Sequence, residues 1–405
     1  MKRTTAILAA TVFALVAATA VRAAAATEFE LARLFMVEHE IASAGVKNPR
    51  VLDSMRKTPR HEFMPIAERG NAYLDMALPI GEGQTISPPF IVAYMTEQLD
   101  PQPTDTVLEI GTGSGYQAAI LSPLVKEVYS IEIVKRLGDQ AARTLKRLGY
   151  KNVHTRVGDG FQGWAEAAPF DKIIVTCSPE KVPEALVDQL REGGRMIVPV
   201  GQRYQQTLYL FEKQEGKLKS IALLPTLFVP MTGKAEDNRV VKPDPANPEL
   251  YNGGFEFEAE GVPTGWHYQR QLTLVDDIRA PEGEHYITFR NKESGRGAQA
   301  LQGLAIDGRL VHDIELSARV RGTEVRPGPG TNDVARMLIV FYDEDRRQLA
   351  ANFLGPWTGT FDWRQDSERF AVPAKAREAN VFLGLCGATG ELSLDDVRLT
   401  PVKKK

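Results

Sequence analysis

Between about residues 105 and 230, short apolar runs alternate with amphipathic stretches, and this alternation limits the possible folds more than any other feature. The runs with the length and β-branched content of buried strands are 107–110, 128–131, 173–176 and 196–200. The stretches with helical periodicity are 117–124, 138–148 and 182–190. Strands that alternate with helices form a parallel sheet with helices on both faces. We therefore expect an α/β, doubly wound, Rossmann-like sheet, and the adjacent runs 207–212 and 218–224 predict a terminal antiparallel hairpin.

The character of the sequence changes on either side of this part. Residues 28–65 have the apolar spacing of short helices. Residues 233–250 are polar and contain Pro243, Pro245 and Pro248, which predicts a linker. Beyond it, apolar and charged residues alternate with a period of two, as in 313–321, between turns rich in Gly, Pro and Asp. The sequence thus predicts a domain at 27–232, a linker at 233–250 and an all-β sandwich at 251–402.

The N-terminus has the pattern of a secretory signal. Lys2 and Arg3 precede an apolar run at 6–21, and small residues follow at 23–26. An uncleaved membrane anchor and a misassigned start codon are the alternatives for residues 1–26. No later run has the ~20 apolar residues that a spanning helix needs, so we expect no integral membrane span once a signal is removed.

Composition and scattered residues exclude several function classes. The chain has 49 Lys plus Arg against 52 Asp plus Glu, a balance that argues against nucleic-acid binding through bulk charge. Two cysteines, Cys177 and Cys386, are too few for a disulfide scaffold, and we expect both to be buried thiols. The six histidines form no metal-binding pattern, so no metal is expected.

A glycine loop lies between the first predicted strand and the next helix. It comprises Gly111, Gly113, Ser114 and Gly115, and such a loop allows a ligand to approach the backbone next to a helix N-terminus. Glu132 should end the following strand, where a carboxylate can accept hydrogen bonds from ribose hydroxyls. Tyr116 stands where the dinucleotide pattern G-x-G-x-x-G has its last glycine. We therefore expect a nucleoside without pyrophosphate, with S-adenosylmethionine as the main candidate.

Two further residues have both a functional and a structural interpretation. Asp159, followed by Gly160, should end another strand at the same edge of the sheet and could accept a hydrogen bond from an adenine amino group. The alternative is an ordinary Asp-Gly turn. Ser87 precedes Pro88, the pattern of a helix N-cap followed by proline at the first helical position. The alternative is a hydroxyl that serves a reaction.

From about residue 34 to residue 232, the chain resembles the protein-L-isoaspartate O-methyltransferase family. The resemblance rests on the glycine loop and on six further segments: Pro-Arg-His-Glu-Phe at 59–63, Leu-Pro-Ile-Gly at 78–81, Gln-Thr-Ile-Ser-Pro at 84–88, Gly-Asp-Gly at 158–160, Gly-Gly-Arg at 193–195 and Val-Pro-Met-Thr at 229–232. Enzymes of this family methylate the free α-carboxylate of isoaspartyl residues with S-adenosylmethionine, which starts the repair of damaged proteins.

The resemblance also implies roles for individual residues. Ser87 would be the active-site serine, and Thr85, Ile86 and Val229 would bind the isoaspartyl substrate. The cofactor would be bound by Gly111, Gly113, Ser114, Gly115, Glu132, Asp159, Gly160 and Thr232. Two departures matter: Val92 stands where some relatives carry a histidine, and about 170 residues follow the segment at which the family usually ends.

Those extra residues are similar to the jelly-roll carbohydrate-binding modules. The similarity rests on Asn-Gly-Gly-Phe-Glu at 252–256 and Leu-Ser-Leu-Asp-Asp-Val-Arg-Leu at 392–399. It implies a possible glycan ligand, for which Trp266, Trp357 and Trp363 could offer stacking faces; the alternative is that these tryptophans pack in the core. A third interpretation is that this region only stabilises the catalytic domain.

The sequence is compatible with two compartments and with two kinds of function. The signal-like segment favours export to the periplasm. The cytoplasm is favoured by the usual location of the family that the chain resembles and by the synthesis of S-adenosylmethionine in that compartment. The alternative to an enzyme is a binding module that keeps the methyltransferase fold and recognises isoaspartyl or glycan sites without turnover.

Overall fold

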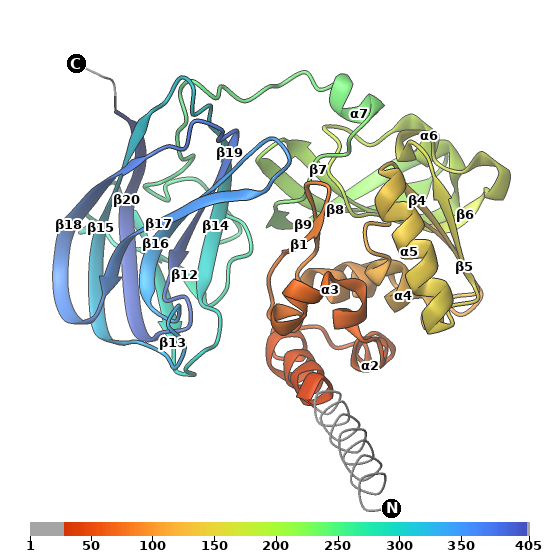
Figure 1. The fold of residues 1–405 in the computed structure, drawn as a ribbon, viewed down its shortest axis with the longest axis horizontal. Helices are drawn as coiled ribbons and strands as arrows, with labels where there is room; N and C mark the ends of the chain where they lie inside the picture. Colours follow the sequence, from red (N-terminus) through yellow and green to blue (C-terminus); the bar gives the residue numbers. More distant parts are fainter. Residues whose placement is uncertain (1–27, 403–405) are drawn as a thin grey trace, which may run out of the picture. The chain divides into compact units, whose positions relative to one another are not determined.

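The computed structural model describes residues 28–402, which divide into two compact units. The first unit contains residues 28–81, 85–158 and 170–174, and the second contains residues 82–84, 159–169 and 175–402. Figure 1 shows the elements along the chain. The predicted signal, residues 1–26, lies outside the described residues, and the domain boundaries at 232 and 250 stay predictions.

Short helices occupy residues 28–65, as the apolar spacing predicts. Residues 28–35 are α-helical, and α2 (Pro49–Lys57) begins after Asn48, whose side chain accepts a hydrogen bond from the Arg50 N–H at 3.0 Å. The proline at its start costs no hydrogen bond there. The other elements before the sheet are η1 (Met36–Ala42), η2 (Arg60–Phe63), η3 (Ile66–Asn71), β1 (Leu78–Gly81), β2 (Gln84–Ile86) and α3 (Pro89–Leu99).

Seven strands form one mixed sheet in the order β5-β4-β3-β6-β7-β8-β9. Their bounds are β3 (Thr106–Ile110), β4 (Glu127–Glu132), β5 (Val153–Val157), β6 (Phe170–Val175), β7 (Leu190–Gln202), β8 (Gln205–Gln214) and β9 (Lys217–Thr226). Strand β4 is parallel to β3 and β5, whereas β8 is antiparallel to β7 and β9. The expected Rossmann-like sheet and its terminal hairpin are confirmed. The strand order reverses at β3, and ligands of open α/β sheets bind beside such a reversal.

Helices connect the strands where the sequence predicts them. The longest, α5 (Lys135–Leu148), buries Leu137, Ala141 and Leu145 along one face and ends at Gly149, which has a φ of 85°. A glycine in this left-handed conformation is the common stop of a helix. The other connecting helices are α4 (Tyr116–Leu121), η4 (Ser122–Leu124), η5 (Gly160–Gln162), η6 (Ala165–Ala167) and α6 (Glu184–Gln189).

The residues predicted to form a linker start with ordered structure. They include the short helix α7 (Lys234–Asp237). The Glu180 carboxylate accepts hydrogen bonds from the backbone N–H groups of Val240 at 2.7 Å and Val241 at 3.1 Å. A small hairpin follows, formed by β10 (Glu258–Ala259) and β11 (Val262–Pro263).

The remaining strands form two antiparallel sheets. The five-stranded sheet has the order β12-β13-β20-β15-β18, and the four-stranded sheet has the order β14-β19-β16-β17. Their bounds are β12 (Leu272–Asp276), β13 (His285–Asn291), β14 (Gln299–Ala305), β15 (Asp313–Arg326), β16 (Ala335–Tyr342), β17 (Gln348–Trp357), β18 (Gly359–Ala371), β19 (Glu378–Gly384) and β20 (Thr389–Pro401). We call residues 251–402 the β region; it is all-antiparallel, as expected.

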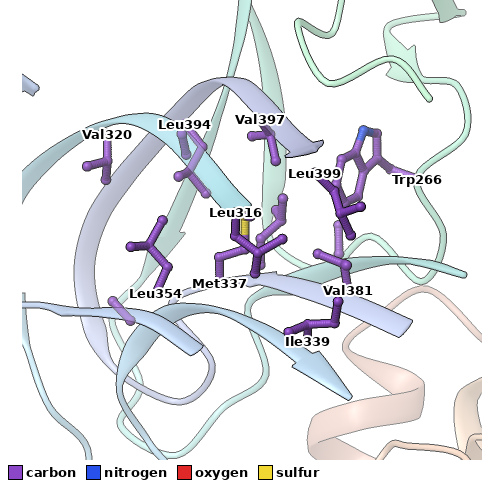
Figure 2. Packing of buried hydrophobic residues seen from close by; sticks show 14 of the residues in the cluster. Trp266, Leu316, Val320, Met337, Ile339, Leu354, Val381, Leu394, Val397 and Leu399 are labelled. Carbon is purple, nitrogen blue, oxygen red and sulfur yellow. The ribbon is translucent and has the colours of Figure 1, made fainter. Parts of the chain in front are cut away.

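Both sheets of the β region contribute to one hydrophobic core (Figure 2). Leu316 and Leu394 come from the five-stranded sheet, and Met337 and Val381 come from the four-stranded sheet. The period of two along each strand explains this packing, because alternate side chains point to the same face.

Two of the three tryptophans considered as stacking faces are core residues. Trp266 and Trp357 are 0% and 1% exposed, and their indole N–H groups donate to the Asn252 carbonyl at 3.0 Å and to Asp366 at 2.9 Å. The expectation that they could stack on a sugar is therefore wrong, since a buried ring offers no free face. Trp363 is half-buried. The guanidinium carbon of Arg321 lies 4.8 Å from its ring centroid.

Candidate active site

The glycine loop connects β3 to α4 in a conformation that needs its glycines. Gly111, Gly113 and Gly115 have φ values of 95°, 54° and 91°, which side chains with a Cβ rarely adopt. The backbone N–H of Gly111 donates to the Ile131 carbonyl at 2.9 Å, which holds the loop against β4. A Cβ on Gly115 would lie 3.1 Å from Leu145 Cδ1, so the close packing of α5 also requires glycine there.

Glu132 ends β4 and is bonded to the glycine loop. The side chain belongs to a residue that is 5% exposed, and it accepts hydrogen bonds from the N–H groups of Gly113 at 2.7 Å and Val134 at 2.9 Å. Burial raises the pKa of this carboxyl, and the backbone donors oppose that shift. The structure thus brings together Glu132 and the loop, as the spacing of 21 residues predicts.

A second carboxyl, Glu109, lies under the loop and was missed by the sequence analysis. It is 0% exposed on β3 and accepts a hydrogen bond from the Ser130 hydroxyl, which is itself 2.6 Å from the hydroxyl of Thr112. Burial raises the pKa of Glu109 to about 8, the Ser130 hydrogen bond lowers it, and the nearby Glu132 raises it. Glu109 therefore carries a proton at neutral pH. The available signal was an acidic residue inside an otherwise apolar strand.

The loop borders a small hollow in the first unit. Gly113 and Ser114 line it together with Glu62, Phe63 and Ile80. Two of the segments behind the family resemblance, 59–63 and 78–81, thus meet at the loop although they are distant from it in sequence.

Ser87 does not cap the helix that follows it, so that prediction is wrong. Helix α3 starts at Pro89, its N-cap position is Pro88, and the backbone N–H of Phe90 donates instead to Asp75 Oδ1 at 2.8 Å. Because Asp75 accepts from this N–H, the Ser87 hydroxyl is not needed as the cap. Within residues 28–402, Ser87 Oγ makes no hydrogen bond. Ser87 and Thr85 are half-buried, and Ile86 is 4% exposed.

The remaining predicted site residues lie in the second unit. Asp159 caps η5 by accepting from the Phe161 N–H at 3.0 Å, and its other oxygen accepts from the Lys234 N–H at 3.2 Å. Asp159 thus forms the turn that was its alternative interpretation, and it also binds the backbone just after Thr232. Gly160 is buried and Thr232 is half-buried.

Val229 lies in a backbone ladder with Ser178. The Ser178 N–H donates to the Val229 carbonyl at 2.8 Å, and the Met231 N–H donates to the Ser178 carbonyl at 2.9 Å. The structure therefore groups Asp159, Gly160, Val229 and Thr232 in the second unit, and the glycine loop, Glu132 and Ser87 in the first.

Residues 28–402 contain no group of three or more His, Cys, Asp or Glu side chains placed to hold a metal ion. Cys177 is buried as expected, whereas Cys386 is only half-buried, and neither forms a disulfide bond. No helix in the same part of the chain has the length and apolarity that crossing a membrane takes.

The part of the chain that holds these residues is similar to known proteins. A family model described as protein-L-isoaspartate(D-aspartate) O-methyltransferase matches residues 33–236. The chain is 56% identical over 188 residues to protein-L-isoaspartate O-methyltransferase 2 of Syntrophobacter fumaroxidans, an alignment that covers 46% of this chain and 76% of that protein. It is 53% identical over 201 residues to protein-L-isoaspartate O-methyltransferase of Opitutus terrae, covering 49% of this chain and 86% of that protein.

A solved structure is also similar to part of the chain. It is a β-aspartate methyltransferase of Plasmodium falciparum in complex with S-adenosyl-L-homocysteine, 25% identical, covering 49% of this chain and 98% of that chain with a TM-score of 0.45. The family model does not extend over residues 237–402.

Proposed function

The chain belongs to the protein-L-isoaspartate(D-aspartate) O-methyltransferase family, and from this premise we propose how its residues perform the reaction. The enzyme uses S-adenosylmethionine to methylate the α-carboxylate of isoaspartyl residues in damaged proteins. When bound, this co-substrate supplies an activated methyl group on a sulfonium.

The residues of the glycine loop fit a nucleoside ligand. Three glycines with positive φ expose the backbone at the N-terminus of α4, and the Glu132 carboxylate is held at the same place by the Gly113 N–H. We assign cofactor binding to Gly111, Gly113, Ser114, Gly115 and Glu132. Asp159, Gly160 and Thr232, which lie together in the second unit, would bind the rest of the nucleoside.

The acceptor carboxylate needs positioning and no general base. An α-carboxyl group has a pKa of roughly 3.3–3.7, so it is already ionised at neutral pH. Correct alignment of reacting groups contributes up to ~7–11 kcal/mol in well-oriented reactions. Excluding water helps further, because a hydrated carboxylate is a poorer nucleophile.

We propose that the Ser87 hydroxyl holds this carboxylate by donating a hydrogen bond. The observation that carries the proposal is the free hydroxyl: Asp75 caps α3, and Ser87 Oγ has no hydrogen bond within residues 28–402. Thr85, Ile86 and Val229 would shape the surroundings of the isoaspartyl residue.

The test is the Ser87→Ala variant assayed with an isoaspartyl peptide. We expect kcat/KM to fall by at least about tenfold, the effect of losing one oriented hydrogen bond, while the affinity for S-adenosylhomocysteine in calorimetry stays unchanged. Turnover close to that of the wild type would refute the role of Ser87. Peptide binding by the wild type without incorporation of a labelled methyl group would instead support the non-catalytic binding module.

For the β region we propose a jelly-roll arrangement and a glycan ligand that contacts Trp363. Trp363 is the one tryptophan of the three that stays half-buried, although Arg321 lies over its ring. The full chain and its Trp363→Ala variant should differ in retention on a glycan array. Equal retention, or none by the wild type, would remove the glycan proposal.

We also propose that residues 1–26 are a cleaved signal. We further propose that the mature chain consists of a catalytic domain at 27–232, a linker at 233–250 and a β-sandwich domain at 251–402. Mass spectrometry of the mature N-terminus after cell fractionation tests the first part. A mature chain that retains Met1 to Ala26 would contradict it.

A further inference from the structure

The segment 227–238 follows β9 and carries two of the proposed site residues, Val229 and Thr232. Apart from the short helix α7 and one β-bridge between Pro230 and Ser178, it has no regular structure, so side-chain contacts also help to hold it in place. Within the methyltransferase part of the chain, which we define as residues 33–236, Gln206 forms hydrogen bonds with both backbone groups of Phe228. The Phe228 N–H donates to Gln206 Oε1 at 2.7 Å, and Gln206 Nε2 donates to the Phe228 carbonyl at 3.1 Å. Ser178 bonds the backbone at Val229 and Met231.

A first additional anchor comes from the β region. The Tyr268 hydroxyl donates to the Leu227 carbonyl at 2.6 Å, at the point where β9 ends and the segment begins. His267, next in sequence, is 1% exposed and its Nε2 lies 2.9 Å from the Tyr204 carbonyl. The start of the segment and the turn between β7 and β8 are thus both bonded by adjacent residues of the β region.

A second anchor is Glu378 of β19, which is 3% exposed. One of its oxygens accepts from the Tyr204 hydroxyl at 3.3 Å and lies 3.6 Å from Arg203 Nη2, and the other pairs with Arg346. Glu378 is therefore the buried anion between two arginines, Arg203 from the turn between β7 and β8 and Arg346 from the β region.

From Arg203, charge pairs continue into the segment. Arg203 Nη1 lies 2.7 Å from Glu236 Oε1, and the other oxygen of Glu236 lies 2.8 Å from Arg239 Nε. Arg239, 5% exposed, donates to the Ser178 carbonyl at 3.1 Å and to the Gly201 carbonyl at 3.0 Å. Ser178 forms backbone hydrogen bonds with Val229 and Met231. A continuous series of ion pairs and hydrogen bonds therefore connects Glu378, through Arg203, to the backbone of the segment.

We infer that the β region positions the segment 227–238 for methyl transfer, through Tyr268 and Glu378. This inference rests on the proposed roles of Val229 and Thr232. Both anchors lie beyond residues 33–236, the part matched by the family model. Tyr268 and Glu378 are positioning residues, because they act through Leu227 and Arg203.

The physical basis is the cost of leaving buried groups without a partner. Removal of the Tyr268 hydroxyl leaves the Leu227 carbonyl without this donor, and such a loss weakens the local order of the backbone. Neutralising Glu378 leaves Arg203 and Arg346 beside each other without the anion between them, and breaking a buried ion pair by one partner is strongly unfavourable. In both cases the segment should open more often than in the wild type.

The test compares full-length Tyr268→Phe and Glu378→Gln with the wild type. The matched control is Glu391→Gln, the same side-chain change at a carboxylate that pairs with Arg290 at 2.7 Å inside the β region. Hydrogen exchange of peptides covering 227–238 should accelerate by about threefold or more in both test variants and not in the control. The dissociation constant for S-adenosylhomocysteine and the KM for an isoaspartyl peptide should rise by about three- to tenfold, with kcat changed less.

Exchange in 227–238 that stays at the wild-type rate in both test variants would overturn the inference. So would an acceleration of equal size in the Glu391→Gln control, since that would report general loosening of the β region. Hydrogen exchange and S-adenosylhomocysteine affinity do not depend on turnover. A wild type that binds S-adenosylhomocysteine but transfers no methyl group would therefore contradict the proposed function while these two measurements still decide the positioning role.

Discussion

Replacing Glu109 with glutamine should change how the stability of the methyltransferase part depends on pH. Glu109 is completely buried beneath the glycine loop, and its pKa is raised from 4.5 to about 8 by burial, with a further contribution from Glu132. The folded state thus holds a proton on Glu109 that the unfolded chain releases near pH 4.5. Glutamine has the same shape and no proton to release.

The direction and the size of this pH effect follow from the linkage between proton binding and folding. For an acid whose folded pKa is raised, the stabilising effect is fully present below the unfolded pKa and is lost as the pH rises through the folded pKa. For Glu109 this window extends from 4.5 to about 8. Across it, the free energy of unfolding of the wild type should fall relative to that of Glu109→Gln, by an amount that approaches roughly 5 kcal/mol.

Urea denaturation at several pH values between 5 and 9 measures this difference. The helical signal in circular dichroism reports the methyltransferase part, because the β region between residues 251 and 402 contains no helix. We expect the denaturation midpoint of the wild type to fall relative to the variant as the pH rises. Parallel pH profiles for the two proteins would show that Glu109 does not keep its proton in the folded state, and the reasoning from burial would be refuted.

Three further measurements test other parts of the structure. Asp75→Ala should destabilise α3 by about 1 kcal/mol in thermal denaturation, whereas Ser87→Ala should not; the reverse order would restore the serine as the cap. Gly115→Ala should lower the free energy of unfolding by roughly 1–3 kcal/mol, because Gly115 has a φ of 91° and a Cβ there would lie close to Leu145. The variant should also bind S-adenosylhomocysteine more weakly, and an unchanged dissociation constant in calorimetry would contradict this. Burial lowers the pKa of His267 to about 4, so the stability that the neutral imidazole contributes should be lost as the pH falls from 6.5 to 4. Acid unfolding followed by tryptophan fluorescence should therefore differ between the wild type and His267→Gln, and coincident transitions would contradict this prediction.

The parts of the fold with local periodicity could be predicted from the sequence. The runs at 107–110 and 128–131 became β3 and β4, since apolar strands between helices have few other solutions. The position of Glu132 beside the glycine loop also followed from spacing, because consecutive parallel strands end at the same edge of the sheet.

Contacts between residues distant in sequence could not be predicted. The local pattern at Ser87 and Pro88 favours a cap, but Asp75, which is separated from Phe90 by 15 positions, reaches the helix first. Glu378 meets Tyr204 across 174 positions, and no periodicity refers to such a pair. Trp266 and Trp357 have no local sign of their burial, since a tryptophan in a strand pattern can face either side of the sheet.

The strand order of the β region sets when this part can form during synthesis. Strand β20 lies between β13 and β15, although the 97 residues 292–388 separate β13 from β20 along the chain. As the chain leaves the ribosome, the facing edges of β13 and β15 stay without a partner until residues 389–401 have been synthesised. Unpaired edges of this kind favour aggregation. The methyltransferase sheet is complete long before that point, so nascent molecules should depend on chaperones mainly while β20 is still being made.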